Sequence, residues 1–262
     1  MLRMYDCRSD GVYMPLLYYS RQEGPKVMLV GMLHAGEKPF YQRVNNILQK
    51  RDAVIYEEPF VRDAETMQHL DEEWRPLLEG TNEDDAFVAA IRMPMPPQKF
   101  MRDQGWIEQV RCFDYSQEHW ISGDGAWGRG KADVRLTEQT WQQIYERIRT
   151  VEKKIRDEKI RAAKFFLHKV DVESATVRDY ISFRQLYEKE IEQMVNHPTL
   201  VYSRDDMALE VFDEAIRTRS PRYVGMIFGN GHVPHMDKLL RVRGFQLKTV
   251  QWLRILTITS HE

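Results

Sequence analysis

Two histidines, nearly two hundred residues apart, each follow an apolar run and a glycine. His34 comes after Val27–Met32, and His232 comes after Val224–Phe228. Both runs are typical of buried strands, and both end in the spacing Gly-x-x-His. Glycine lets a backbone turn sharply and approach a ligand, and a neutral imidazole can bind a metal or act as a base. These two turns therefore predict the centre of a site.

Carboxylates stand at comparable positions. Glu57 directly continues the apolar run Ala53–Tyr56, where a buried charge is costly unless it is paired or coordinating. Glu58 follows it. Asp114 ends the stretch Gln109–Asp114, which we predict to be a further strand, and it could orient a histidine. All three are candidate catalytic residues, and Arg204 is a fourth.

One arginine stands near a helix start. Ser203 and Asp206 have capping-box spacing, so a helix is expected to begin at Ser203 with Arg204 in its first turn. A positive charge there opposes the helix dipole. Arg204 is therefore either retained for a carboxylate or substrate, or points to solvent. The remaining histidines lack such a context and are predicted to be structural: His69, His119, His168, His197, His235 and His261.

The first elements of the chain are typical of a hairpin and a βαβ unit. Gly11–Ser20 and Lys26–Met32 flank a Gly-Pro turn, which predicts a β-hairpin. Pro15 indicates that the first of these strands lies at a sheet edge. Glu37–Lys50 has helical periodicity and precedes the strand Ala53–Tyr56. Ligands of open α/β sheets bind at the carboxyl ends of such strands.

The second half combines helices with a return to the sheet. The predicted elements are helices at 136–170 and 177–194, a helix from Ser203, a strand at 223–228, a helix at 234–242 and a final strand at 246–258. We predict a single α/β domain over 1–262. Its mixed, mostly parallel sheet has βα halves at each end of the chain and a long helical insertion at about 136–219. The glycine- and tryptophan-rich stretch 120–130 is either a lid or a surface loop.

Composition narrows the classes of function. The chain has 262 residues. Its net charge of −2 lacks the excess of positive charge that is typical of proteins that bind nucleic acid or an anionic membrane. No stretch approaches the roughly 18 continuous apolar residues needed to cross a bilayer. The N-terminal residues lack the apolar stretch of a signal peptide. We expect a cytoplasmic protein.

The order of these motifs resembles the TraB/TIKI family, which is related in fold to ChaN-like and erythromycin-esterase proteins. The matching segments are Val27–Gly36, Ala53–Glu58, Gln109–Asp114, Ser203–Ala208 and Tyr223–Met236. The resemblance implies an α/β fold with both histidine motifs facing one cleft, and a metal-dependent peptidase. The resemblance matches His34 and His232 to the two histidines of the family's motifs. It matches Glu57 to the carboxylate at a strand end and Arg204 to the arginine at a helix start. Met32, Pro59 and Asp205 depart from the family's usual Thr, Asp and Asn.

Three functions follow as hypotheses. In the first, His34, Glu57 and His232 hold manganese, cobalt or zinc and activate a water for hydrolysis of a peptide or small molecule. In the second, a histidine is the general base of a metal-independent esterase. In the third, the site binds a ligand or peptide without catalysis. Helices within 136–195 could bind a protein partner or a second copy of the chain, although mutual packing is the simpler interpretation.

Overall fold

The computed structural model describes residues 5–57, 98–123, 177, 181 and 202–258. The chain divides into two compact units, and the first contains the described ranges 5–57, 106–123 and 202–258. The second unit holds helix α4 (Gln98–Asp103).

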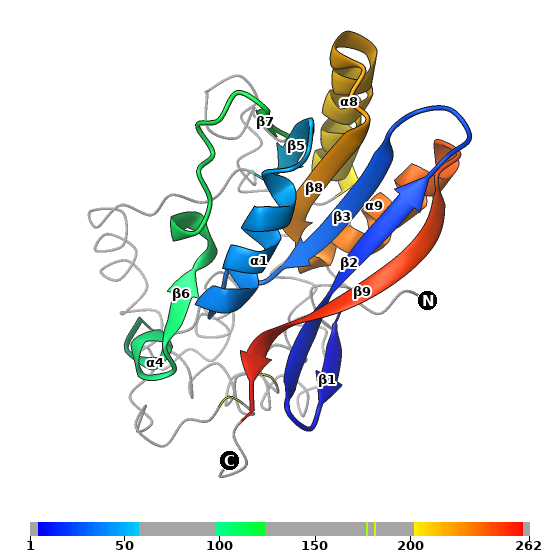
Figure 1. The fold of residues 1–262 in the computed structure, drawn as a ribbon. Coiled ribbons are helices and arrows are strands. Elements are labelled where there is room, and N and C mark those ends of the chain that lie inside the picture. Colours follow the sequence, from blue (N-terminus) through cyan, green and yellow to red (C-terminus); the bar gives the residue numbers. More distant parts are fainter. Residues whose placement is uncertain (1–4, 58–97, 124–176, 178–180, 182–201, 259–262) are drawn as a thin grey trace, which may run out of the picture. The chain divides into compact units, whose positions relative to one another are not determined.

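A seven-stranded sheet organises the first unit (Figure 1). The strand order is β1-β2-β3-β8-β5-β7, and β9 pairs with the other side of β2. The strands are β1 (Asp6–Arg8), β2 (Gly11–Ser20), β3 (Lys26–Met32), β5 (Ala53–Tyr56), β7 (Trp120–Ser122), β8 (Tyr223–Gly229) and β9 (Gln246–Thr257). A separate pair joins β4 (Ala35–Glu37) to β6 (Trp106–Glu108).

The half of the sheet that carries the histidine motifs is parallel. β3, β8, β5 and β7 pair in parallel, and β8 lies between β3 and β5. Apart from their first residues, β3 and β8 are buried along their whole length. Such continuous burial explains why both appear in the sequence as uninterrupted apolar runs, since parallel strands are covered on both faces. The predicted α/β class with a mostly parallel sheet is confirmed.

The other end of the sheet is antiparallel. The predicted hairpin is present, because β2 pairs antiparallel with β3. The edge position predicted from Pro15 is wrong. On one side, β9 pairs along the whole length of β2, and on the opposite side β2 pairs with both β1 and β3. Pro15 pairs with Trp252 of β9, while on the other side it falls between the segments paired to β1 and β3. The missing N–H is tolerated there because one flank of Pro15 has no ladder partner.

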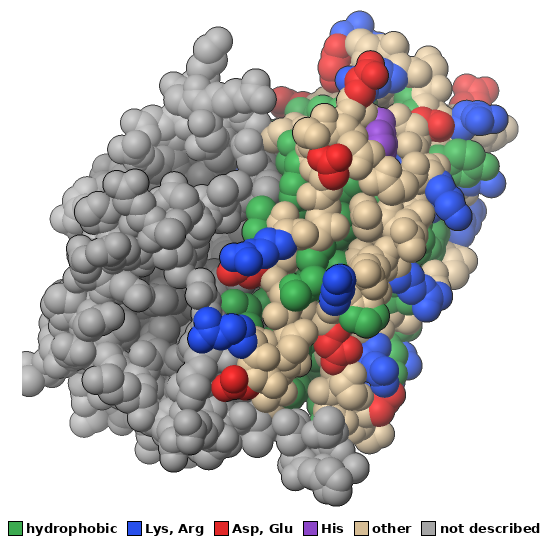
Figure 2. Space-filling view, turned by 60° about the vertical axis from the view of Figure 1, so that its left-hand side comes forward, with side chains coloured by type: hydrophobic (Ala, Val, Ile, Leu, Met, Phe, Trp, Pro, Cys, Tyr) green, Lys and Arg blue, Asp and Glu red, His purple; other side chains and the backbone are tan. Residues whose placement is uncertain are grey.

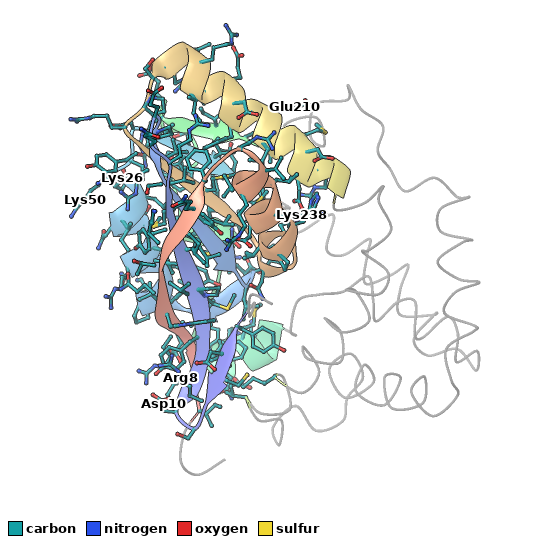
Figure 3. All side chains as sticks on the ribbon, turned by 90° about the vertical axis from the view of Figure 1, so that its right-hand side faces the viewer. Arg8, Asp10, Lys26, Lys50, Glu210 and Lys238 are labelled. Carbon is teal, nitrogen blue, oxygen red and sulfur yellow. The ribbon has the colours of Figure 1, made fainter. Side chains whose placement is uncertain are left out.

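Helices cover both faces of the sheet. Helix α1 (Lys38–Leu48) lies on one face, and helices α8 (Tyr202–Arg219) and α9 (Val233–Val242) lie on the other (Figure 3). A Cβ at Gly225 of β8 would come 2.6 Å from Leu48 of α1, so this glycine permits the close approach of α1. The side facing α8 and α9 is packed with Phe212, Phe228 and other fully buried apolar residues.

Two predicted elements differ from the structure. The stretch 109–114 is not a strand: Gln109–Arg111 forms a short 3-10 helix, η1. On the side of β5 away from β8, the neighbouring strand is β7, whose three residues begin the stretch predicted to be a lid or loop. Alternation of buried and polar residues is too brief in a three-residue strand to be recognised from sequence.

The helical region is described only at its end. Helix α8 begins at Tyr202, so Ser203 lies within the helix rather than before it. The helix ends at Arg219. The next residue, Ser220, has a φ of 45° and is followed by Pro221. The remaining predicted helices between 136 and 195, apart from Val177 and Ile181, lie outside the described residues, as do residues 124–130.

The surface of the described part carries mixed charge. On the face that Figure 2 shows, acidic and basic side chains are interspersed rather than gathered by sign. Among the described residues, no helix is both long and apolar enough to cross a membrane.

Candidate functional site

The two histidine turns and Glu57 meet at the carboxyl ends of three neighbouring parallel strands. Met32, the last residue of β3, pairs with Gly229, the last residue of β8. On the other side of β8, the backbone N–H of Glu57 donates to the carbonyl of Ile227 at 2.9 Å. The side chains that gather here form the strand-end cluster: His34, Glu57, Gln109, Arg204, Asp205, His232 and His235.

Glu57 is at the centre of the cluster. Its Oε1 lies 3.0 Å from Nη2 of Arg204 and 3.3 Å from Nε2 of His232. Its Oε2 accepts a hydrogen bond from the backbone N–H of Gly229. Burial by itself raises the pKa of the Glu57 carboxyl, but the charges of His232, Arg204 and His34 outweigh it and hold that pKa well below its usual range. Glu57 is therefore a buried carboxylate whose two oxygens are both engaged.

His232 lies between two carboxylates. Its Nδ1 is 2.6 Å from Oδ1 of Asp205, and its Nε2 faces Glu57. Burial lowers the pKa of His232, yet the charge of Glu57 and the bond to Asp205 prevail and raise it to about 9. Carboxylates only accept hydrogen bonds, so a ring that faces one at each nitrogen carries a proton on both. The two carboxylates therefore favour the doubly protonated form of His232.

Asp205 joins a second histidine to the cluster. It is fully buried, and its Oδ2 lies 2.9 Å from Nδ1 of His235. His235 has none of the glycine and strand context that singles out His34 and His232, and it was therefore missed among the candidates. It does stand three residues after His232 at the start of α9, and thus on the same side of that helix. That spacing is the signal in the sequence that could have identified it.

Arg204 has a structural reason to stand in the first turn of α8. It pairs with Glu57 and is only partly exposed, so of the two predicted alternatives it takes the first, the partner of a carboxylate. The neighbouring Asp205 is negative at a helix N-terminus, where the dipole favours it. These two adjacent residues thus bind opposite partners, Glu57 and the histidine pair.

His34 is the exposed member of the cluster. Its Nδ1 lies 3.3 Å from Oε1 of Gln109, and the backbone N–H of Gln109 donates to the His34 carbonyl at 2.8 Å. The buried Gln109 begins η1, and it was missed because it was predicted to begin a strand. Two bonds to one residue hold the turn and the ring together.

Gly229 lies beside Glu57, His34 and His232. A Cβ at this position would lie 2.9 Å from Oε2 of Glu57, 3.6 Å from Nε2 of His34 and 3.6 Å from Cδ2 of His232. All three predicted metal-ligating side chains therefore border the same small space beside one backbone carbon. A larger residue would fill that space.

One other predicted residue, Asp114, lies away from this cluster. Asp114 is exposed, and its carboxylate accepts hydrogen bonds from the hydroxyl and the N–H of Ser116, which lower its pKa. The proposed catalytic or orienting role of Asp114 is therefore not supported by its place, because the chain turns at η1 before reaching a strand end. Glu58 lies outside the described residues.

A divalent ion fits this donor set poorly. Zinc and manganese need neutral imidazoles and available carboxylate oxygens. Here both nitrogens of His232 face carboxylates, both oxygens of Glu57 are engaged and the cation of Arg204 is adjacent. Among the residues that the structure describes, no group of three or more His, Cys, Asp or Glu side chains is arranged to hold a metal ion.

Comparison of the chain with protein-family models, curated proteins and solved structures gave no match.

Proposed function

We propose that this protein is a metal-independent hydrolase of esters or related acyl compounds, in which His34 is the general base. The observation that supports this most directly is the contrast within the cluster. One exposed imidazole stands beside a buried group of paired charges, Glu57, Arg204 and His232. A base must reach its substrate, whereas a preorganised electrostatic environment works best away from water.

In the proposed reaction, Nδ1 of His34 donates its hydrogen to Gln109, and Nε2 is the nitrogen that acts as the base. Nε2 takes a proton from water as the water oxygen bonds to the carbonyl carbon. The bond from that carbon to the leaving oxygen then breaks, and His34 returns the proton to the leaving group. The positive charges of His232 and Arg204 offset the negative charge that develops on the carbonyl oxygen.

Glu57 has a supporting role in this scheme. Its carboxylate holds both cations in place, and its lowered pKa makes it a weak base. The scheme agrees with the proposed resemblance to the TraB/TIKI family, because a histidine base would open an ester in its erythromycin-esterase relatives. Metal-dependent hydrolysis, the first hypothesis from sequence, would require His232 to lose its proton and Glu57 to change partners.

The proposal is tested with the purified 262-residue chain and p-nitrophenyl acetate and butyrate, in the presence of a strong chelator. Hydrolysis is expected to survive chelation. His34→Gln should lower kcat/KM by about 100-fold or more, the usual contribution of a general base. Lys50→Gln, at an exposed lysine after α1, is the control and should behave as wild type.

Other results would contradict this proposal or support a different function. Activity that disappears with chelator and returns with manganese, cobalt or zinc would favour the metal-dependent hydrolase. Full activity in His34→Gln would exclude His34 as the base. No hydrolysis of any acyl substrate, with ligand binding retained in a His34→Ala/His232→Ala variant, would favour a binding protein.

A further inference from the structure

His232 is held by a carboxylate that it shares with a second histidine. Asp205 is fully buried, and each of its two oxygens lies within hydrogen-bond distance of one imidazole: Oδ1 at 2.6 Å from His232 and Oδ2 at 2.9 Å from His235. In both rings the nitrogen involved is Nδ1. Because a carboxylate only accepts, both Nδ1 atoms carry the hydrogen.

We propose that Asp205 and His235 act as one positioning pair, which fixes the ring of His232 with its Nε2 toward Glu57. His235 is a positioning residue in this arrangement, since it acts on the strand-end cluster through Asp205. The role of His232 in hydrolysis rests on the function proposed above, whereas the pair itself rests on geometry.

The physical reason lies in the burial of Asp205. A buried carboxylate oxygen that lacks a donor has lost its hydration without compensation, which destabilises the folded chain. The N–H of His235 satisfies Oδ2 and leaves Oδ1 directed at His232. Without that N–H, Asp205 would gain by turning both oxygens toward the remaining donor, and the ring of His232 would follow. The orientation of His232 toward Glu57 at 3.3 Å therefore depends on a residue that reaches it through one shared carboxylate.

The backbone supports this division of roles. Asp205 is in the first turn of α8, while His232 ends the short helix η2 (Asn230–His232) and His235 lies in the first turn of α9. The side chain of Asp205 thus links α8 to two residues at the start of α9, His232 and His235. The pair also fixes how the β8–α9 turn sits against α8.

The test uses NMR of the full chain with ¹⁵N-labelled histidine rings, with the His232 signals assigned from His232→Gln. Wild type should show His232 protonated at both nitrogens, a downfield Nδ1–H, and His235 as the Nδ1–H form. His235→Phe keeps a ring but removes the donor, and it should shift the His232 Nδ1–H signal. His235→Asn presents an amide N–H near the place of Nδ1 and should restore that signal. Lys238→Gln, on the exposed side of α9 (Figure 3), is the matched control and should leave it unchanged.

Each result decides the proposal. Unchanged His232 signals in His235→Phe, or an Asn variant no closer to wild type than the Phe variant, would overturn it. If His235→Phe does not fold, the wild-type spectrum decides alone, because His235 protonated only at Nε2 is incompatible with a bond to Asp205. Ester hydrolysis is measured separately. A chain without activity that shows the expected signals loses the proposed function but keeps the positioning pair.

Discussion

At the scale of single residues, the cluster depends on whether buried charges are compensated. At the 3.3 Å between Glu57 and His232, two unit charges attract by about 5 kcal/mol at an effective dielectric of 20. Desolvation of each ion costs several kcal/mol, so this attraction alone is insufficient. Arg204, the N–H of Gly229 and Asp205 supply the remainder. The pKa directions of Glu57 and His232 both show that the charged forms prevail.

This predicts how stability depends on pH. The folded pKa of His232, about 9, lies above its unfolded value of 6.5, so its contribution is complete below 6.5 and is lost as pH rises through 9. Between these values the folded state binds the extra proton, and stability should fall by up to about 1.4 kcal/mol per pH unit. The lowered pKa of Glu57 acts in the opposite direction, since its contribution is present above 4.5 and lost as pH falls through the folded pKa.

The measurement is urea unfolding from pH 6 to 9. Wild type should lose stability across this range more steeply than His232→Gln, which lacks the titrating ring. Glu210→Gln, at an exposed position of α8 labelled in Figure 3, should retain the wild-type slope. Equal slopes in wild type and His232→Gln would show that His232 does not hold its extra proton in the folded state.

At the scale of elements, the site depends on alignment of the strand ends. Asp52, the residue before β5, helps to align the beginning of β5 with the beginning of β8. Its Oδ2 accepts from the backbone N–H groups of Arg222 and Tyr223 at 2.7 and 2.8 Å. This register brings Tyr56 opposite Ile227, so that Glu57 reaches Gly229 at the far end of the strands. An exposed aspartate at one end thus helps to set the geometry at the other.

Asp52→Ala is therefore expected to destabilise the protein by about 1–2 kcal/mol, because two backbone N–H groups lose a charged acceptor at an exposed position. Asp52→Asn keeps one carbonyl oxygen and should recover part of the loss. Urea denaturation of the three proteins checks this. An Ala variant with the wild-type midpoint would mean that the backbone pairs of β5 and β8 hold the register without Asp52.

At the scale of the whole molecule, the first compact unit is built from both ends of the chain. Its last strand, β9, returns beside β2, so that Tyr19 pairs with Leu247 and Gly11 pairs with Thr257. β8, from the later part of the chain, likewise lies between β3 and β5, which both come from its early part. The strand-end cluster therefore exists only when these distant segments have come together. A ligand that needs the whole cluster should bind only the folded chain and should raise its stability.

Metal binding is tested at this scale. A ligand at 100 times its Kd stabilises by about 2.7 kcal/mol if it binds only the native state. We expect manganese, cobalt and zinc to raise the Tm of wild type no more than that of a His34→Gln/His232→Gln variant, because both nitrogens of His232 face carboxylates and both oxygens of Glu57 are engaged. A rise confined to wild type would instead support the metal site predicted from sequence.

Much of the fold was predictable because periodicity and turn chemistry are local. The strands at 26–32, 53–56 and 223–229, the first helix and the last strand follow from apolar runs, glycine turns and helical spacing. The errors arose where a local rule met a tertiary context. Pro15 is tolerated inside the sheet because its neighbours leave a gap, and Gln109 begins a 3-10 helix whose side chain is needed at His34.

The sequence by itself determined that His34, Glu57 and His232 stand at strand ends, because each closely follows an apolar run. Only the tertiary structure decided that β8 lies between β3 and β5, and hence that these three side chains border one space. It also decided that Arg204 binds Glu57, that Asp205 bridges His232 and His235, and that Asp114 binds Ser116. Partners and protonation depend on distance and burial, which residues far apart in the chain acquire only when it folds.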